Sequence, residues 1–98
     1  MSALDIEPLP SFVRDVKRLL KRHADITKLN TVVNLIAENT AASIKTLEQH
    51  HSMHVLKGPW KGHHECHVCN AGDWLLIWVV DHGVAYLERT GSHDELFR

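Results

Sequence analysis

Residues that can hold a phosphate and transfer protons are concentrated in the last third of this 98-residue chain. His67, Asp73, Arg89 and His93 interrupt segments that otherwise have the pattern of β-strands. Imidazoles titrate near neutral pH and can serve as general acid or base, while a guanidinium can stabilise negative charge that develops on a phosphate. Because neighbouring strands bring distant parts of a chain together, the pattern indicates a site that binds phosphate and moves protons.

Three strands are predicted around these residues, over 60–68, 73–80 and 84–89. The turn residues Asn70–Gly72 and Asp81–Gly83 separate them. The segment 73–80 is almost continuously apolar, which is typical of a central strand covered on both faces. We expect these strands to pair with one another in an antiparallel sheet.

Side-chain alternation assigns the residues of each strand to one face or the other. Glu65 and His67 should share a face of their strand, and Leu87 and Arg89 should share a face of theirs. The assignment is compatible with a concave site that draws on His67, Asp73 and Arg89, although a β-bulge would shift it. Taken singly, each residue also has a commoner role, as a surface histidine, a turn aspartate or an arginine paired with a nearby glutamate.

The first half of the chain predicts two helices joined by a tight link. Ser11 can cap a first helix, in which apolar residues recur at helical spacing and which ends near Asp25. Asp25 or Thr27 can cap a second helix, which fades at residues 38–40. The polar segment 41–53 is predicted to be a loop with at most one turn of helix.

The order of elements is β-α-α-β-β-β, with a short edge strand at residues 4–7 before the helices. It predicts an α+β fold, a small antiparallel sheet with an N-terminal helical hairpin packed on one face. A chain of this length supports one modest core, so residues 1–98 should form a single domain. The face opposite the hairpin would be only partly covered, and we expect the function to lie there.

The overall charge is nearly balanced, with 11 Lys and Arg against 12 Asp and Glu. This is a weak balance for a nucleic-acid-binding protein, but the first predicted helix and its flank are locally basic, with Arg14, Lys17, Arg18, Lys21, Arg22 and Lys28. No apolar run approaches the ~18 residues that would span a bilayer, and the acidic N-terminus lacks a signal-peptide pattern. The sequence therefore predicts a cytoplasmic protein with no membrane partner.

A second group of possible ligands occupies residues 63–69, with the sequence HHECHVC. Its C-x-x-C pair is similar to half of a zinc site. An extended strand, however, directs Cys66 and Cys69 to opposite faces, and a further ligand would have to be a distant histidine such as His54 or His93. We therefore expect no metal site here, and we expect Cys66 to be a buried apolar residue.

Three motifs follow one another in a fixed order: HVLKGPWKG at residues 54–62, DWLLI at 73–77 and ERTGSH at 88–93. Together with Asp5–Glu7 and the basic first helix, this series resembles the RelE/ParE superfamily of bacterial type II toxins, specifically its YafQ-like branch. The resemblance covers most of the chain and is most specific in the first of these motifs. It implies a small antiparallel sheet carrying an N-terminal helical hairpin, in agreement with the order of elements.

The resemblance also implies an activity and partners. Members of this branch are ribosome-dependent endoribonucleases that cut mRNA in the decoding site, and each is neutralised by a cognate antitoxin protein. Carried onto matching positions, the resemblance implies an active site made of His54, His67, Asp73, Arg89, His93 and Phe97. Phe97 would stack on an RNA base, and Lys57 and Lys61 would bind substrate. Trp74 is left out because alternation turns it away from Asp73.

The implied reaction needs no metal or other cofactor. The RNA 2′-OH would attack the adjacent phosphate and leave a 2′,3′-cyclic phosphate and a 5′-OH end. His93 is our first choice for general acid, and His54 or His67 would be the general base. Asp73 would orient an imidazole or contact substrate, and Arg89 would stabilise the phosphate.

Two other functions remain compatible with the sequence. One is a non-enzymatic inhibitor of a protein target, as in the ParE branch, although such an inhibitor does not need several proton-transfer residues. The other is a small His/Cys metal-binding module, which metal analysis of the purified protein would test. Under the nuclease hypothesis, His93→Ala and Arg89→Ala should abolish growth inhibition and leave the fold intact.

Overall fold

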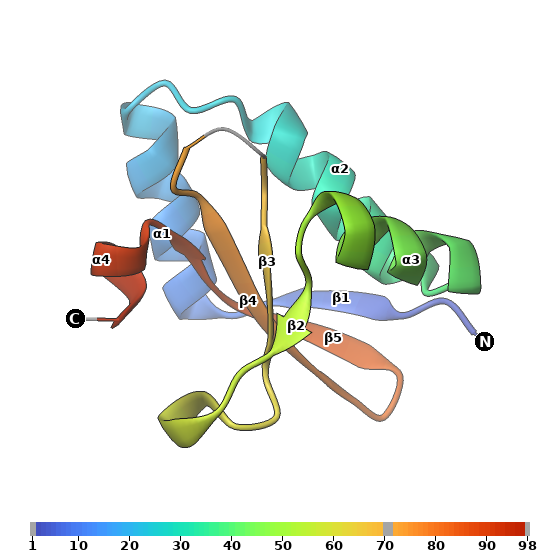
Figure 1. The fold of residues 1–98 in the computed structure, drawn as a ribbon. Coiled ribbons are helices and arrows are strands. Elements are labelled where there is room, and N and C mark those ends of the chain that lie inside the picture. Colours follow the sequence, from blue (N-terminus) through green and yellow to red (C-terminus); the bar gives the residue numbers. More distant parts are fainter. Residues whose placement is uncertain (1, 70–71, 98) are drawn as a thin grey trace.

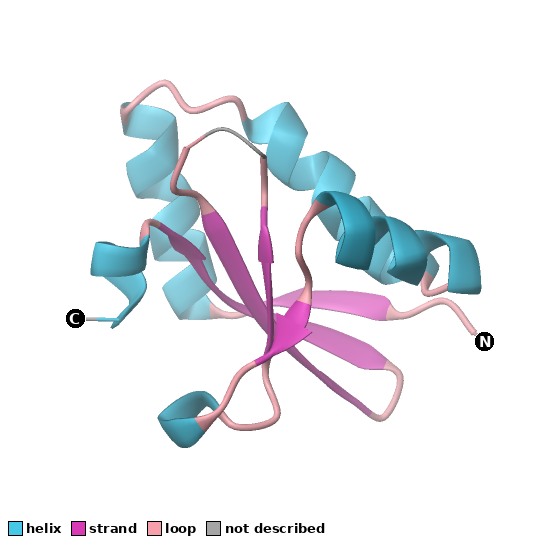
Figure 2. Ribbon diagram, in the orientation of Figure 1, coloured by secondary structure: helices cyan, strands magenta, loops and turns pink. Residues whose placement is uncertain are grey.

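The chain forms one sheet with most of its helices on one face, as Figures 1 and 2 show. The computed structural model describes residues 2–69 and 72–97, and the elements below are those of this part of the chain. Its strands are β1 Asp5–Pro8, β2 His54–Val55, β3 His64–His67, β4 Leu75–Asp81 and β5 Val84–Gly91. Its α-helices are α1 Pro10–Lys21, α2 Ile26–Glu38, α3 Ala41–His50 and α4 His93–Phe97, and a 3₁₀ turn, η1, spans Gly58–Trp60.

The strands lie in the order β1-β5-β4-β3-β2. The predicted α+β class is confirmed, but the sheet is mixed, because β1 runs parallel to β5 while the other pairs are antiparallel. A short turn fixes the antiparallel pairing of β4 with β5. No such turn joins β1 to β5, because three α-helices and three strands lie between them along the chain. The local sequence therefore could not predict whether β1 runs parallel or antiparallel to β5.

The N-cap and the C-terminal end predicted for the first helix both need correction, whereas the cap predicted for the second helix is confirmed. Leu9, not Ser11, is the N-cap of α1, and the Ser11 hydroxyl instead donates to the carbonyl of Glu88 at 2.7 Å. This helix ends at Lys21, before the predicted Asp25. Asp25 caps α2 as predicted, since its carboxylate accepts the backbone N–H of Thr27.

The segment predicted as a loop contains a ten-residue helix, α3. Thr40 and Ser43 form a reciprocal capping box at its start, and Ser43 and Leu47 are buried one turn apart. The usual signature has Glu or Gln in the place of Ser43, which is why the pattern was weak in the sequence. Tertiary packing of one face stabilises this otherwise polar helix.

The predicted strands are longer than the observed ones. Residues 60–63 belong to η1 and the turn after it rather than to β3, and β4 begins at Leu75 rather than at Asp73. Neither the short strand β2 nor the C-terminal helix α4 was predicted. The predicted turn at Asn70–Gly72 lies mostly outside the described residues.

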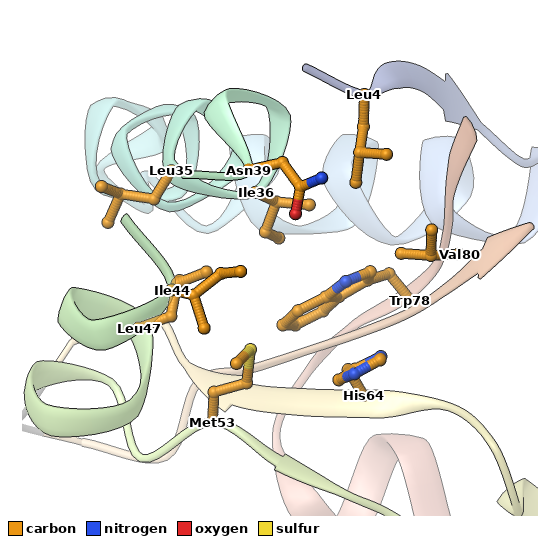
Figure 3. Close-up of a pocket in the computed structure, with 10 residues that line it drawn as sticks. All are labelled: Leu4, Leu35, Ile36, Asn39, Ile44, Leu47, Met53, His64, Trp78 and Val80. Atoms are coloured by element: carbon orange, nitrogen blue, oxygen red, sulfur yellow. The ribbon is translucent and has the colours of Figure 1, made fainter. Parts of the chain in front are cut away.

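Most buried apolar side chains lie between the sheet and the first three helices. This main core consists of Phe12, Leu29, Val32, Ile36, Leu47, Cys66, Val68, Leu76, Trp78, Ala85 and Leu87. Burial raises the pKa of the Cys66 thiol to about 12, which agrees with its predicted role as an apolar residue. A hollow of about 270 Å³ beside this core is lined by apolar side chains, by Asn39 and by His64 (Figure 3). The His64 ring stacks on Trp78 with 5.4 Å between centroids.

A smaller apolar cluster lies on the other face of the sheet. It is formed by Leu75, Ile77 and Leu96, with Leu56 and Trp60 packed against them. The loop containing η1 and the helix α4 therefore cover part of the face that the first three helices leave open. Over the described residues, no helix has the length and apolar character needed to cross a membrane.

Candidate active site

A row of paired residues crosses four strands on the face opposite the main core. His54 pairs with Glu65, Glu65 with Ile77 and Ile77 with Arg89. Residues paired across neighbouring strands have side chains on the same face, and Ile77 belongs to the smaller apolar cluster. The sheet thus brings His54 and Arg89 to one face from opposite ends of the row.

A β-bulge in β5 is responsible for the position of Arg89. Ile77 pairs with Arg89 and Trp78 pairs with Leu87, so Glu88 is an extra residue on this strand. Leu87 consequently points into the main core while Arg89 lies on the other face. The prediction that Leu87 and Arg89 share a face is wrong, because alternation alone gives no sign of a bulge.

The next row places His67 on the same face as Arg89. His67 pairs with Leu75, and Leu75 pairs with Gly91, the last residue of β5. The chain then turns directly into α4, which begins at His93. His67 and His93 are therefore close together, with 6.5 Å between their ring centroids. Two imidazoles at this separation can contact different oxygens of one phosphate.

His93 and Asp73 form a hydrogen-bonded pair beside His67. His93 Nδ1 lies 2.9 Å from Asp73 Oδ1, and the backbone N–H of His93 donates to the same carboxylate. Because an ionised carboxylate only accepts, Nδ1 carries a proton and Nε2 is the nitrogen available for reaction. The hydrogen bonds from His93 lower the pKa of Asp73, so this carboxylate is ionised at neutral pH.

The backbone around His67 is held by His51, which follows α3. The N–H of His67 donates to the His51 carbonyl at 2.7 Å, and His51 Nδ1 donates to the His67 carbonyl at 2.8 Å. The residue that follows the unpredicted helix α3 thus fixes the position of the His67 backbone.

His54 faces a buried carboxylate that sequence reasoning did not assign to the site. Its Nε2 lies 3.3 Å from Glu65 Oε1, and its Nδ1 donates to the Ser52 carbonyl at 2.9 Å. Glu65 is 4% exposed, and its Oε2 has no hydrogen-bond partner among the described residues. The signal was present in the sequence, since alternation had already put Glu65 on the face of His67.

Arg89 is bound to a residue that lies far away in the sequence. Its Nε and Nη2 donate to the Asp15 carboxylate at 2.7 and 3.2 Å, and this hydrogen bonding raises the pKa of Arg89. Asp15 is 2% exposed and also accepts from Arg18 and from the backbone N–H of Thr90. The alternative role of Arg89, pairing with a nearby glutamate, is not found among the described residues. Within this part of the chain, Nη1 is the guanidinium nitrogen left for a ligand.

The partner of Arg89 follows from the geometry of the sheet edge. The parallel strand β1 ends at Pro8, opposite Leu87, so among the described residues the outer edge of β5 has no strand partner beyond that point. Helix α1 covers this edge, where Ser11 binds the Glu88 carbonyl and Asp15 binds the Thr90 N–H. The same carboxylate therefore closes the sheet edge and holds Arg89.

Two of the three predicted substrate-binding residues line a hollow of about 480 Å³ between η1 and α4. Lys57 and Phe97 line it, whereas Lys61 is exposed at the end of η1. Phe97 also lies beside His93, with 5.9 Å between ring centroids. Phe97 thus lines the hollow and also contacts the histidine cluster.

Trp74 lies outside the cluster, as alternation predicted. Its indole N–H donates to the Thr90 hydroxyl at 2.9 Å, and its ring packs against the main core. As for the zinc alternative, no group of three or more His, Cys, Asp or Glu side chains in ranges 2–69 and 72–97 is arranged to hold a metal ion.

Glu95 links helix α4 both to Ser92 at its own N-terminus and to two arginines in and after α1. Ser92 and Glu95 form reciprocal hydrogen bonds at the start of the helix. Arg18 of α1 and Arg22, which follows α1, form ion pairs with Glu95 Oε2 at 2.8 and 3.0 Å. The backbone N–H of Ser92, with Arg18 and Arg22, lowers the pKa of Glu95 from 4.5 to about 2. These contacts hold the segment that carries His93 and Phe97.

Glu95→Gln should therefore destabilise the protein in a pH-dependent way. A carboxylate whose folded-state pKa is depressed stabilises the fold above its unfolded pKa, and this contribution is lost as pH falls towards the folded pKa. We expect E95Q to lower the free energy of unfolding by about 1–3 kcal/mol at pH 7, and the difference from wild type to shrink between about pH 5 and pH 2. Urea denaturation at pH 7 and pH 3 measures both values.

Asp94→Asn is the matched control for that prediction, because Asp94 is exposed on the same helix. D94N should change stability little at either pH. A loss in E95Q that is the same at pH 7 and pH 3 would show that the Glu95 charge does not fasten α4.

The sheet has α1, α2 and α3 on one face and a cluster of histidines with an aspartate and an arginine on the other, which is the arrangement that the resemblance to RelE/ParE-type toxins implied. The family model for the bacterial toxin of type II toxin–antitoxin systems, YafQ, matches residues 4–98. The mRNA interferase toxin YafQ of Escherichia coli strain K12 is 38% identical over 93 residues, which are 95% of each chain. The chain therefore belongs to the YafQ family of type II toxins.

Solved structures agree with this assignment. The crystal structure of YafQ from E. coli strain BL21(DE3) matches with a TM-score of 0.83 and 36% identity, over 97% of this chain and 99% of that one. The toxin in the E. coli DinJ–YafQ toxin–antitoxin complex matches with a TM-score of 0.82 and 36% identity, over 98% and 99% of the two chains. These similarities confirm the predicted family, the fold and the class of enzyme, an endoribonuclease of the mRNA interferase kind.

Proposed function

We propose that this toxin cuts mRNA on the translating ribosome by metal-independent general acid–base catalysis. The observation that carries the proposal is the pair of imidazoles, His67 and His93, 6.5 Å apart, with Asp73 hydrogen-bonded to His93 Nδ1. In the proposed reaction the 2′-OH loses its proton to a base and attacks the adjacent phosphorus, and the 5′ oxygen leaves with a proton from an acid. The products are a 2′,3′-cyclic phosphate and a 5′-OH.

The roles follow from which ring nitrogens are available. His93 is the general acid, since the Asp73 carboxylate accepts a hydrogen bond from Nδ1 and leaves Nε2 as the nitrogen that donates a proton to the leaving oxygen. His67 or His54 is the base. Arg89, through Nη1, stabilises the phosphate. General acid–base catalysis is typically worth ~10²–10⁴-fold, and electrostatic stabilisation of this kind ~10²–10³-fold.

The partners in this proposal are RNA, the ribosome and a cognate antitoxin. Arg14, Lys17 and Lys21 are exposed along α1, and Lys57 and Lys61 are exposed on the loop over the site, so basic side chains are available for phosphates despite the balanced net charge. The E. coli relative forms a complex with DinJ, and we propose that an antitoxin likewise neutralises this toxin. The toxin acts in the cytoplasm, as one domain over residues 1–98, and its Cα radius of gyration of 12.6 Å is that of a single small domain.

The ends of the cleaved RNA test this proposal. Messages translated in vitro with the purified toxin should be cut to fragments with 5′-OH and 2′,3′-cyclic phosphate ends. The rate should not change when a zinc-selective chelator that spares the Mg²⁺ of the ribosome is added. The same messages without ribosomes should remain intact. Fragments with 5′-phosphate ends, or equal cleavage without ribosomes, would contradict the mechanism or the ribosome dependence respectively.

A further inference from the structure

We propose that Trp60 forms one wall of a nucleobase pocket, and that the hydrogen bond between His63 and Glu88 positions it. This inference rests on the proposed function, since it names the part of the RNA that the hollow between η1 and α4 accepts. The hollow has a volume of about 480 Å³ and is lined by Leu56, Lys57, Pro59, Trp60, Leu96 and Phe97.

The lining has the composition of a site for a flat, uncharged ring with a phosphate attached. Two aromatic rings, Trp60 and Phe97, lie edge-to-face with 6.3 Å between their centroids. Leu96 supplies an apolar floor, and Lys57 stands exposed at the rim, where it can meet a phosphate. Aromatic walls with a cation at the edge are how proteins bind single-stranded RNA bases.

Because of its position, the hollow would bind the base of a nucleotide next to the cleaved phosphodiester, not a base farther along the RNA. Phe97 lines the hollow and also lies 5.9 Å from His93, centroid to centroid. Exposure of Phe97 is 42%, which is high for a large apolar side chain and leaves a ring face available. A nucleotide whose phosphate lies between His67 and His93 therefore has its own or its neighbour's base within reach of the hollow.

Trp60 also contacts His63, which does not line the hollow and which is itself bound to Glu88. Its ring packs edge-to-face on His63, with centroids 5.2 Å apart and planes at 88°. His63 Nε2 lies 3.0 Å from Glu88 Oε1, and Glu88 is the extra residue of the β5 bulge. The backbone N–H of His63 also donates to the Trp60 carbonyl at 3.0 Å. The bulge that places Arg89 on the catalytic face thus also supplies the anchor for Trp60.

The first test is the steady-state kinetics of Trp60→Ala and Trp60→Phe on translated messages that differ in one codon. Stacking contributes to ground-state and transition-state binding alike, so W60A should raise KM by about 5- to 150-fold with little change in kcat. W60A should also flatten the differences among codons, and W60F should retain most of both properties. Unchanged KM and codon differences in a folded W60A protein would overturn the inference.

The second test concerns the positioning pair. His63→Ala should raise KM in the same direction as W60A but less, and His63→Gln, whose amide can still donate to Glu88, should keep a KM close to that of wild type. Equal effects of H63A and H63Q would show that the hydrogen bond does not position Trp60. Thermal melts of each variant establish that the protein measured is folded.

A binding experiment separates this inference from the proposed function. Tryptophan fluorescence of the inactive His93→Ala protein is titrated with a short single-stranded oligoribonucleotide, and saturable quenching that W60F retains only in part is expected. If wild type proves unable to cut translated messages but the quenching is present, the nuclease proposal fails and the pocket stands. Cleavage with no quenching and no effect of W60A gives the opposite result.

Discussion

His93→Ala should reduce the rate of cleavage of a translated message by about 10²–10⁴-fold, the range expected when a general acid is removed. The reason is geometric: Asp73 fixes His93 Nδ1, so Nε2 is the nitrogen that can deliver a proton to the leaving oxygen. The side chain of His93 is 57% exposed, so its removal should cost little stability. Single-turnover cleavage on programmed ribosomes, together with growth after induction, measures the effect.

His50→Ala is the matched control, because His50 is exposed at the end of α3 and is not part of the cluster. H50A should cleave at the wild-type rate. Asp73→Asn should give a smaller loss than H93A, since the amide oxygen of the new side chain can still accept from the His93 backbone N–H and from Nδ1–H, although its neutral amide is a weaker acceptor than a carboxylate. Wild-type cleavage by a folded H93A protein would remove His93 from the mechanism.

Arg89→Ala should lower activity and stability together. Loss of the guanidinium should slow cleavage by about 10²–10³-fold if Arg89 stabilises the phosphate. The same change leaves the buried Asp15 carboxylate without its main partner, and breaking a buried ion pair from one side costs about 3 kcal/mol. The structure therefore revises the expectation that R89A leaves the fold unaffected.

Variants of Asp15 separate these two effects of Arg89. Asp15→Ala should lower the free energy of unfolding by about 3 kcal/mol, since it strips Arg89, Arg18 and the Thr90 N–H of one shared acceptor. It leaves the Arg89 guanidinium in the protein, so cleavage by the folded fraction should fall much less than in R89A. Urea denaturation and single-turnover cleavage at a temperature where both variants are folded make the comparison. Equal losses of activity in D15A and R89A would mean that Arg89 acts only by anchoring α1.

The sequence predicted the class of fold because its local signals were strong and independent. Apolar residues at helical spacing identified α1 and α2, and the apolar run that begins at Trp74 identified the central strand β4. It missed α3, where a weak capping pattern and burial of Leu47 decide the structure. It also missed the parallel direction of β1, which depends on contacts between the two ends of the chain.

The sequence by itself determined which chemical groups are available: several imidazoles, an aspartate and an arginine in strand-like segments, in an order that marks the family. Only the tertiary structure decided how they are paired. Alternation carries no information about the bulge at Glu88 that turns Arg89 to the catalytic face, or about the sheet edge that gives it Asp15 as a partner. The placement of His67 against His51, and of Trp60 against His63 and Glu88, likewise depends on contacts between segments whose separation in sequence hides their proximity. Hydrogen bonds and ring contacts of this kind form only when the whole sheet is assembled, which is why the residue types could be predicted and their geometry could not.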